Sequence, residues 1–109
     1  MNFESYQIEA RKTALYPDKG QNYIYPTLGL VGESGEVAEK IKKIIRDKGG
    51  IIDSDSKFGL KKELGDVLWY LSNLCDELNF TLEDVANTNL EKLKLRVIKG
   101  NISGSGDDR

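Results

Sequence analysis

The amino-acid sequence predicts an all-α domain, and three observations support this prediction. Apolar residues recur with the period of an α-helix, capping or breaking residues separate the periodic stretches, and no stretch shows the alternation of a strand. We expect about four helices packed as an antiparallel bundle. A chain of 109 residues is most simply one domain with a modest core of its own. Because the helices are apolar over a wide arc, we expect homo-oligomerisation to complete the bundle.

Local signals define the first helix and the loop that follows it. Asn2 can cap a helix over residues 3–15, which Pro17 and Gly20 then end. Residues 16–26 contain three tyrosines and are expected to form a loop at the entrance to the second helix.

The second and third helices flank a short connection. The second is expected from residue 26 or 27 to residue 47, where Gly49-Gly50 breaks the pattern. Residues 51–56 connect it to a third helix over residues 57–79.

The last helix opens at Thr81, which begins a capping-box pattern, and extends to about residue 98. We therefore take residues 1–99 as one domain. Residues 100–109 have the composition of a flexible tail, which is either disordered or a lid over a ligand.

Composition excludes several classes of protein. The formal net charge is −2 and no stretch is basic, so the chain is not expected to coat nucleic acid, although small phosphorylated ligands fit. Cys75 is the only cysteine, which excludes an internal disulfide and favours a buried apolar role in a reducing compartment. No apolar run approaches the roughly 18 residues of a membrane span, and no signal peptide is apparent. We expect a cytoplasmic protein with no membrane partner.

One short acidic pattern occurs twice, at residues 30–37 and 60–67. Both copies have the form Leu-x-x-Glu-x-Gly-acid-Val. In a helix the two acids of each copy lie one turn apart on the same face, so two such helices packed together bring four carboxylates close to one another. These candidate ligands are Glu33, Glu36, Glu63 and Asp66.

The apolar neighbours of the two patterns also repeat. Apolar residues lie at the same offsets from Glu33 and Glu63, so both glutamates border the stripe that faces the core. Burying carboxylates there is costly unless a cation compensates their charge. In the alternative interpretation the acids are solvated and pair with Lys40, Lys43 or Lys62. The apolar residues concerned are Leu30, Val37, Ile41 and Ile44 in the first copy, and Leu60, Val67, Leu71 and Leu74 in the second.

Oxygen ligands without histidine or cysteine select a hard cation. We therefore expect Mg²⁺, with Mn²⁺ as a substitute, and a substrate that carries phosphate groups. The sequence has no histidine, which counts against a ferritin-like di-iron centre. Residues 53–55 begin like a calcium loop, but Phe58 and Leu64 replace the glycine and glutamate that such a loop requires.

Two further groups can contact a nucleotide. Asn89 lies within an apolar stripe of the fourth helix, with Lys92 and Arg96 close to it in helical phase, so these side chains can meet phosphate oxygens. Alternatively, Asn89 satisfies a neighbouring backbone group and the two cations extend to solvent. Trp69 and Tyr70 can stack on a base or simply pack between helices.

Residues 29–40 (GLVGESGEVAEK) and 62–71 (KELGDVLWYL) match the Glu-x-x-Glu, spacer, Glu-x-x-Asp signature of a known family. On these motifs the chain resembles the all-α nucleoside triphosphate pyrophosphohydrolases of the MazG type. Residues 89–96 and 104–109 also resemble the short, single-domain members, so that the resemblance covers nearly the whole chain.

The resemblance implies a metal site and an activity. Glu33, Glu36, Glu63 and Asp66 would be catalytic and would coordinate Mg²⁺. Members cleave a nucleoside triphosphate, often a noncanonical or deoxynucleotide, between its α and β phosphates as a housekeeping activity. The products are a monophosphate and pyrophosphate, and the members work as homodimers or homotetramers.

The resemblance also implies contacts with substrate for Tyr70, Asn89, Lys92, Arg96 and Arg109. The mechanism expected is attack of a metal-bound water, oriented by a glutamate, on the α-phosphorus. The alternative from another class is a non-catalytic helical module that binds a nucleotide or a partner protein.

Overall fold

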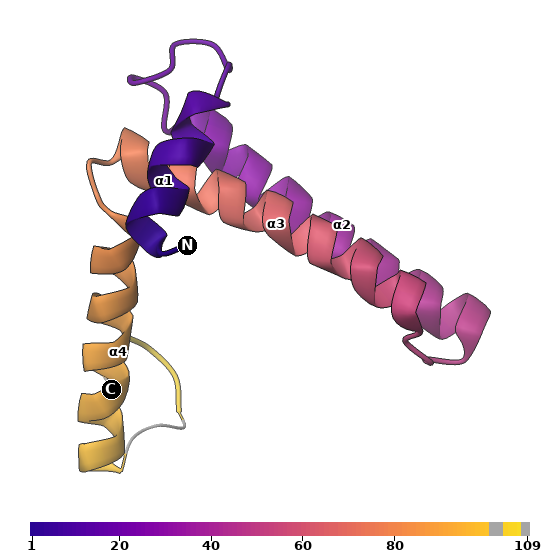
Figure 1. Ribbon diagram of the computed structural model, residues 1–109. Helices are drawn as coiled ribbons and strands as arrows, with labels where there is room; N and C mark the ends of the chain where they lie inside the picture. Colours follow the sequence, from indigo (N-terminus) through magenta and orange to yellow (C-terminus); the bar gives the residue numbers. More distant parts are fainter. Residues whose placement is uncertain (101–103, 108–109) are drawn as a thin grey trace.

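The computed structural model describes residues 1–100 and 104–107, and every regular element within them is a helix. The predicted all-α class is therefore confirmed. Helices α2 and α3 lie side by side as an antiparallel hairpin, α1 crosses its open end, and α4 extends away from it (Figure 1). No helix in this part of the chain combines the length and the apolar character needed to cross a membrane. The helices are α1 (Phe3–Lys12), α2 (Ile24–Lys48), α3 (Ser54–Glu77) and α4 (Leu82–Lys99).

Side-chain caps start three of the four helices. The side chains of Asn2, Asp53 and Thr81 each accept a hydrogen bond from the backbone N–H three residues further along. The caps predicted at Asn2 and Thr81 are confirmed. The cap at Asp53 was not predicted, and it starts α3 at Ser54, earlier than the expected residue 57.

Other helix boundaries also differ from prediction. Helix α1 ends at Lys12 instead of residue 15, because the hydroxyl and the backbone N–H of Thr13 both donate to the Ala10 carbonyl. Helix α2 begins at Ile24, since a proline is tolerated in the first turn, where its missing N–H has no partner to lose. At the other end of α2, Gly49 has a left-handed conformation with φ of 60°, which confirms the predicted break.

The apolar stripes predicted around the two acidic patterns face the interior of the hairpin. Of the eight residues, Ile44 is buried and the other seven are half-buried. Cys75 is buried, as expected. The α2–α3 pair is therefore held by hydrophobic contact along its length.

The four helices of one protomer do not close into a bundle. The radius of gyration is 16.8 Å, whereas a compact chain of this length has about 13 Å. Large apolar side chains remain exposed on α4, among them Leu90, Leu95 and Ile98, and others are exposed on the hairpin, among them Val31 and Leu64. Within one protomer the bundle is incomplete, because α4 points away from the hairpin (Figure 1).

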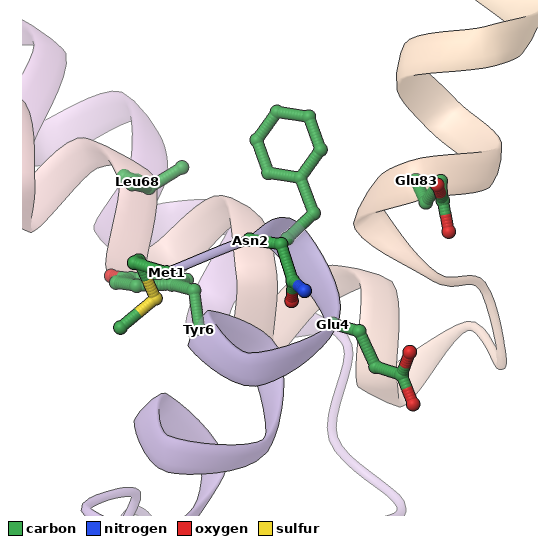
Figure 2. A pocket seen from close by; sticks show the side chains of 7 residues that line it. Met1, Asn2, Glu4, Tyr6, Leu68 and Glu83 are labelled. Atoms are coloured by element: carbon green, nitrogen blue, oxygen red, sulfur yellow. The ribbon is translucent and has the colours of Figure 1, made fainter.

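Gln7 fixes the direction of α4. Its buried side chain donates to Oδ1 of Asp76 and to the Phe80 carbonyl, each at 3.0 Å, and accepts from the Leu82 backbone N–H at 2.9 Å. One amide thus joins α1 to the end of α3 and the start of α4. Beside this junction lies a hollow of about 520 Å³ lined by the start of α1, Leu68 and Glu83 (Figure 2).

Glu77 anchors the loop between α1 and α2. Its side chain is fully buried and accepts hydrogen bonds from Arg11, the Tyr16 hydroxyl, and the backbone N–H groups of Gly20 and Asn22. Burial alone raises the pKa of this carboxyl, but these donors outweigh it and lower the pKa to about 2. The loop is therefore folded around an ionised carboxylate.

We predict that stability falls on acidification through Glu77. Because the pKa in the folded chain lies below its ordinary value, the contribution is complete above about pH 5 and is lost as pH falls towards 2. The contribution is about 3 kcal/mol. Urea unfolding should show the larger part of that loss in the wild type between pH 6 and pH 3, and a flatter profile in Glu77→Gln. The exposed Glu9→Gln is the control, and equal pH profiles for wild type and Glu77→Gln would refute the prediction.

Candidate metal centre

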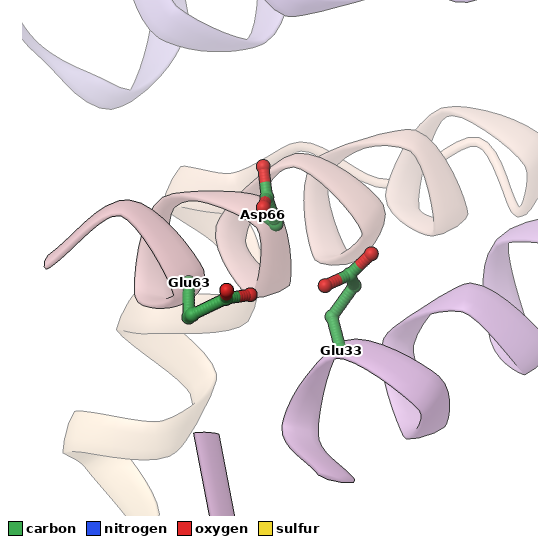
Figure 3. A group of neighbouring side chains, drawn as sticks. All are labelled: Glu33, Glu63 and Asp66. Atoms are coloured by element: carbon green, nitrogen blue, oxygen red, sulfur yellow. The ribbon is translucent and has the colours of Figure 1, made fainter. Parts of the chain in front are cut away.

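Three carboxylates meet at the middle of the α2–α3 hairpin. One oxygen from each of Glu33, Glu63 and Asp66 lies within 4.8 Å of the others. Glu33 extends from α2 towards the two acids of α3, which lie one turn apart on the facing side of that helix (Figure 3). The antiparallel pairing thus unites residues that the two copies of the sequence pattern supply separately.

Within the part of the chain that the structure describes, these like charges are held together without hydrogen-bond donors of the kind that surround Glu77. Burial raises the pKa of Glu33, and the charges of Asp66, Glu63 and Glu36 raise it further. Glu33 and Glu63 are half-buried and Asp66 is exposed, so one side of the group is open to solvent. Three convergent carboxylates with an open side fit a hard divalent cation, which would compensate their charge and leave room for a ligand.

Glu36, the fourth predicted ligand, does not join the group in this conformation. Its side chain is exposed, and the three carboxylates that converge are those of Glu33, Glu63 and Asp66. Its charge nevertheless contributes to the raised pKa of Glu33, so it lies near the site.

A row of aromatic rings leads from the acids to the loop before α2. Tyr70 borders Glu33, and the pKa of its phenol is raised by burial and then by the neighbouring Tyr25 and Glu33. The centroids of the Tyr25 and Tyr70 rings are 6.4 Å apart, and Tyr16 stacks on Tyr25 at 5.0 Å. Sequence reasoning gave no role to Gly29, yet a Cβ atom at this position would overlap the Tyr70 ring. This glycine allows the ring to lie against α2.

Two other neighbours were not predicted as part of the site. Tyr6 of α1 has a pKa raised by burial and then by the charge of Asp66, which places its hydroxyl in the field of the acids. Lys40 lies with Nζ 3.7 Å from Oε1 of Glu63. The sequence predicted Lys40 only as an ion-pair partner in the alternative in which the acids are solvated. Its spacing of seven residues from Glu33 is the signal that places Lys40 on the same face of α2.

The predicted phosphate-binding residues of α4 are apart from the acids within one protomer. Asn89, Lys92 and Arg96 lie on the helix that extends away from the hairpin (Figure 1). Nζ of Lys92 lies 3.0 Å from Oδ1 of Asp107, and Arg96, which is buried, donates to the Asp107 carbonyl at 2.7 Å. Arg109 lies outside the described residues. The structure therefore gathers the acidic residues and Tyr70 in one place and the amide and cations of α4 in another.

We predict opposite effects of Glu33→Gln with and without metal. Without a divalent cation the substitution should raise the melting temperature by roughly 4 °C, because it removes a repulsive charge. Added Mg²⁺ or Mn²⁺ should raise the melting temperature of the wild type more than that of Glu33→Gln. Thermal unfolding monitored by circular dichroism is the measurement, with Glu39→Gln, which removes a half-buried carboxylate of α2 outside the acidic group, as control. An equal metal-induced rise in wild type and Glu33→Gln would exclude Glu33 as a ligand.

Comparisons with known proteins identify the family of the chain. Residues 21–99 match the MazG nucleotide pyrophosphohydrolase domain. The chain is also 46% identical over 114 aligned residues to the "Gene 37 protein" of Mycobacterium phage L5, and the alignment covers all of both chains. No solved structure matches. With the two acidic patterns united inside the matched segment, the chain belongs to the MazG nucleotide pyrophosphohydrolase family.

Proposed function

We propose that this protein is a Mg²⁺-dependent nucleoside triphosphate pyrophosphohydrolase that cleaves a ribo- or deoxynucleotide between its α and β phosphates. The observation that supports this most is the convergence of Glu33, Glu63 and Asp66 in a chain of this family. These residues and Glu36 would hold Mg²⁺, and Mn²⁺ would replace it, since all four supply hard oxygen ligands. The role would be housekeeping of the nucleotide pool in the cytoplasm.

The residues of the chain would bind and orient the substrate, and one of them would accept a proton. When bound, the cation supplies Lewis acidity that offsets phosphate charge and makes water a better nucleophile. Through the cation that they would hold, the carboxylates would fix the position of the α-phosphate, and one of them would accept a proton from the attacking water. The water oxygen forms a bond to the α-phosphorus, the bond from that phosphorus to the bridging oxygen breaks, and its electron pair leaves with pyrophosphate. Without histidine in the sequence, a carboxylate is the natural base.

Substrate contacts would come from two copies of the chain. Tyr70 adjoins the acids, whereas Asn89, Lys92, Arg96 and Arg109 belong to the C-terminal part, whose helix extends away from them in the same protomer. A homodimer or homotetramer would bring α4 of a second copy to the hairpin. It would also cover the apolar side chains that a single protomer exposes on both elements.

We predict an oligomer that depends on the apolar residues of α4. Sedimentation equilibrium should give a mass that is a multiple of 12.2 kDa. The double substitution Leu90→Glu and Val97→Glu places charges on two exposed apolar positions and should shift the mass towards the monomer. Thr88→Glu, which adds a charge at an exposed polar position of the same helix, should leave the mass unchanged. A wild-type protein that remains monomeric at micromolar concentration would contradict the prediction.

We predict that incubation with Mg²⁺ and a panel of ordinary, deoxy and damaged nucleoside triphosphates yields a monophosphate and pyrophosphate. Glu63→Gln should reduce turnover by about 100-fold or more, because it removes a charged ligand of the cation. Its helical circular dichroism should stay unchanged, and Glu39→Gln should keep wild-type turnover. Phosphate as the first product would indicate attack at the γ-phosphorus and would contradict the assignment. Nucleotide binding without any product would favour the non-catalytic module.

A further inference from the structure

Lys40 lies next to the three carboxylates along the seam, by which we mean the line of contact between α2 and α3. Seven residues separate it from Glu33, so it lies on the same face of α2 about two turns, or roughly 10 Å, further along. Across the seam, a Cβ atom on Gly59 would be 3.9 Å from Nζ of Lys40. Glu63 lies one helical turn from Gly59 towards the acidic group. The order along the hairpin is therefore Tyr70, the carboxylates, and then Lys40.

Among the described residues, Lys40 supplies the one ion pair of 4.0 Å or less that Glu33, Glu63 or Asp66 makes. The pair is loose, because its distance of 3.7 Å is longer than a direct charge-assisted hydrogen bond. Both partners also keep contact with solvent, since the Lys40 and Glu63 side chains are 42% and 20% exposed. Such a pair adds little to stability. Lys40 is thus a counter-ion that can leave Glu63 at small cost.

Space is available for this movement. Directly beyond Lys40 lies a hollow of about 290 Å³ between the two helices, with Lys40 and Gly59 on its wall. Gly59 has no side chain that would fill the seam below the ammonium group. A flexible lysine can therefore turn away from Glu63 without a change of backbone.

We propose that Lys40 is the counter-ion of the acidic group in the free protein and a ligand of the terminal phosphates when a divalent cation and a nucleoside triphosphate are bound. This inference rests on the proposed function. A cation that binds Glu63 displaces the ammonium group of Lys40. This group then lies on the side of the three carboxylates that is opposite to Tyr70. A triphosphate whose base side faces the aromatic rings extends its β and γ phosphates towards that side. Lys40 donates hydrogen bonds to them and offsets the charge of the leaving pyrophosphate without transferring a proton.

The test compares Lys40→Met, Lys40→Arg and Lys43→Met. Lys43 is the matched control, because it lies one turn further on α2 and its Nζ is 3.9 Å from Glu39 and not paired with the acidic group. Two equilibria are measured by calorimetry: binding of Mn²⁺ alone, and binding of pyrophosphate in the presence of Mg²⁺. Circular dichroism confirms that each variant folds.

The two equilibria should change in opposite directions. Lys40→Met should bind Mn²⁺ about two- to fivefold more tightly, because the competing cation is gone. It should bind pyrophosphate about tenfold more weakly, because a charged hydrogen-bond donor is gone. Lys40→Arg should retain most of the pyrophosphate affinity, and Lys43→Met should change neither equilibrium.

Failure of this inference can be told apart from failure of the proposed function. Wild-type turnover of triphosphates is assayed in parallel. If the wild type forms pyrophosphate but Lys40→Met binds pyrophosphate as tightly as the wild type, the role of Lys40 is overturned and the function stands. Equal losses in Lys40→Met and Lys43→Met would also overturn it. If no triphosphate is hydrolysed while the opposite shifts persist, the function fails and the assignment of Lys40 holds.

Discussion

The antiparallel pairing of α2 with α3 is the constraint on which the rest of the structure depends. Its register sets Gly29 against Tyr70, Glu33 against Asp66, and Lys40 against Gly59. Apolar stripes on both helices hold this register along the hairpin. Hydrophobic contact therefore keeps the like charges close in the middle of the seam. The free energy gained by burying the apolar stripes offsets the repulsion between the carboxylates.

Two glutamates of the same hairpin show how environment decides the state of a carboxyl. Glu77 is fully buried, yet its pKa is low, because a guanidinium, a phenol and two backbone N–H groups donate to it. Glu33 is less buried, yet its pKa is raised, because burial is opposed by no donor of this kind and the neighbouring carboxylates raise the pKa further. The first arrangement is complete within the chain and organises a loop. The second has only the loose ion pair of Lys40 with Glu63 against three convergent carboxylates, and this incomplete compensation is the physical reason to assign it a cation.

The open shape of the protomer follows from the junction at Gln7. This side chain ties α1 to the end of α3 and the start of α4, and its bonds to the Phe80 carbonyl and from the Leu82 backbone N–H hold α4 in a direction away from the hairpin. The apolar faces of α4 and of the hairpin then stay exposed in one copy. A second copy is the simplest cover for both, and it would bring the cations of α4 to the acids that one protomer keeps apart from them.

The sequence by itself determined the helices and the two acidic patterns. Caps at Asn2 and Thr81, the break at Gly49 and the spacing of Glu33 and Glu63 from their apolar neighbours depend on residues within about three turns, so they are visible in the printed order. These signals gave the all-α class, the acidic candidates and, through the family motif, the expected chemistry. They missed the Asp53 cap, a local signal of the same kind.

Only the tertiary structure decided the direction of α4, the exposure of Glu36, the fit of Tyr70 on Gly29 and the position of Lys40 beside Glu63. Each depends on the register of two helices or on a bond between residues far apart in the chain, such as Gln7 with Leu82. Helical periodicity specifies which face of a helix is buried. It does not specify which residues of another helix meet that face, because this is set by packing over the whole contact.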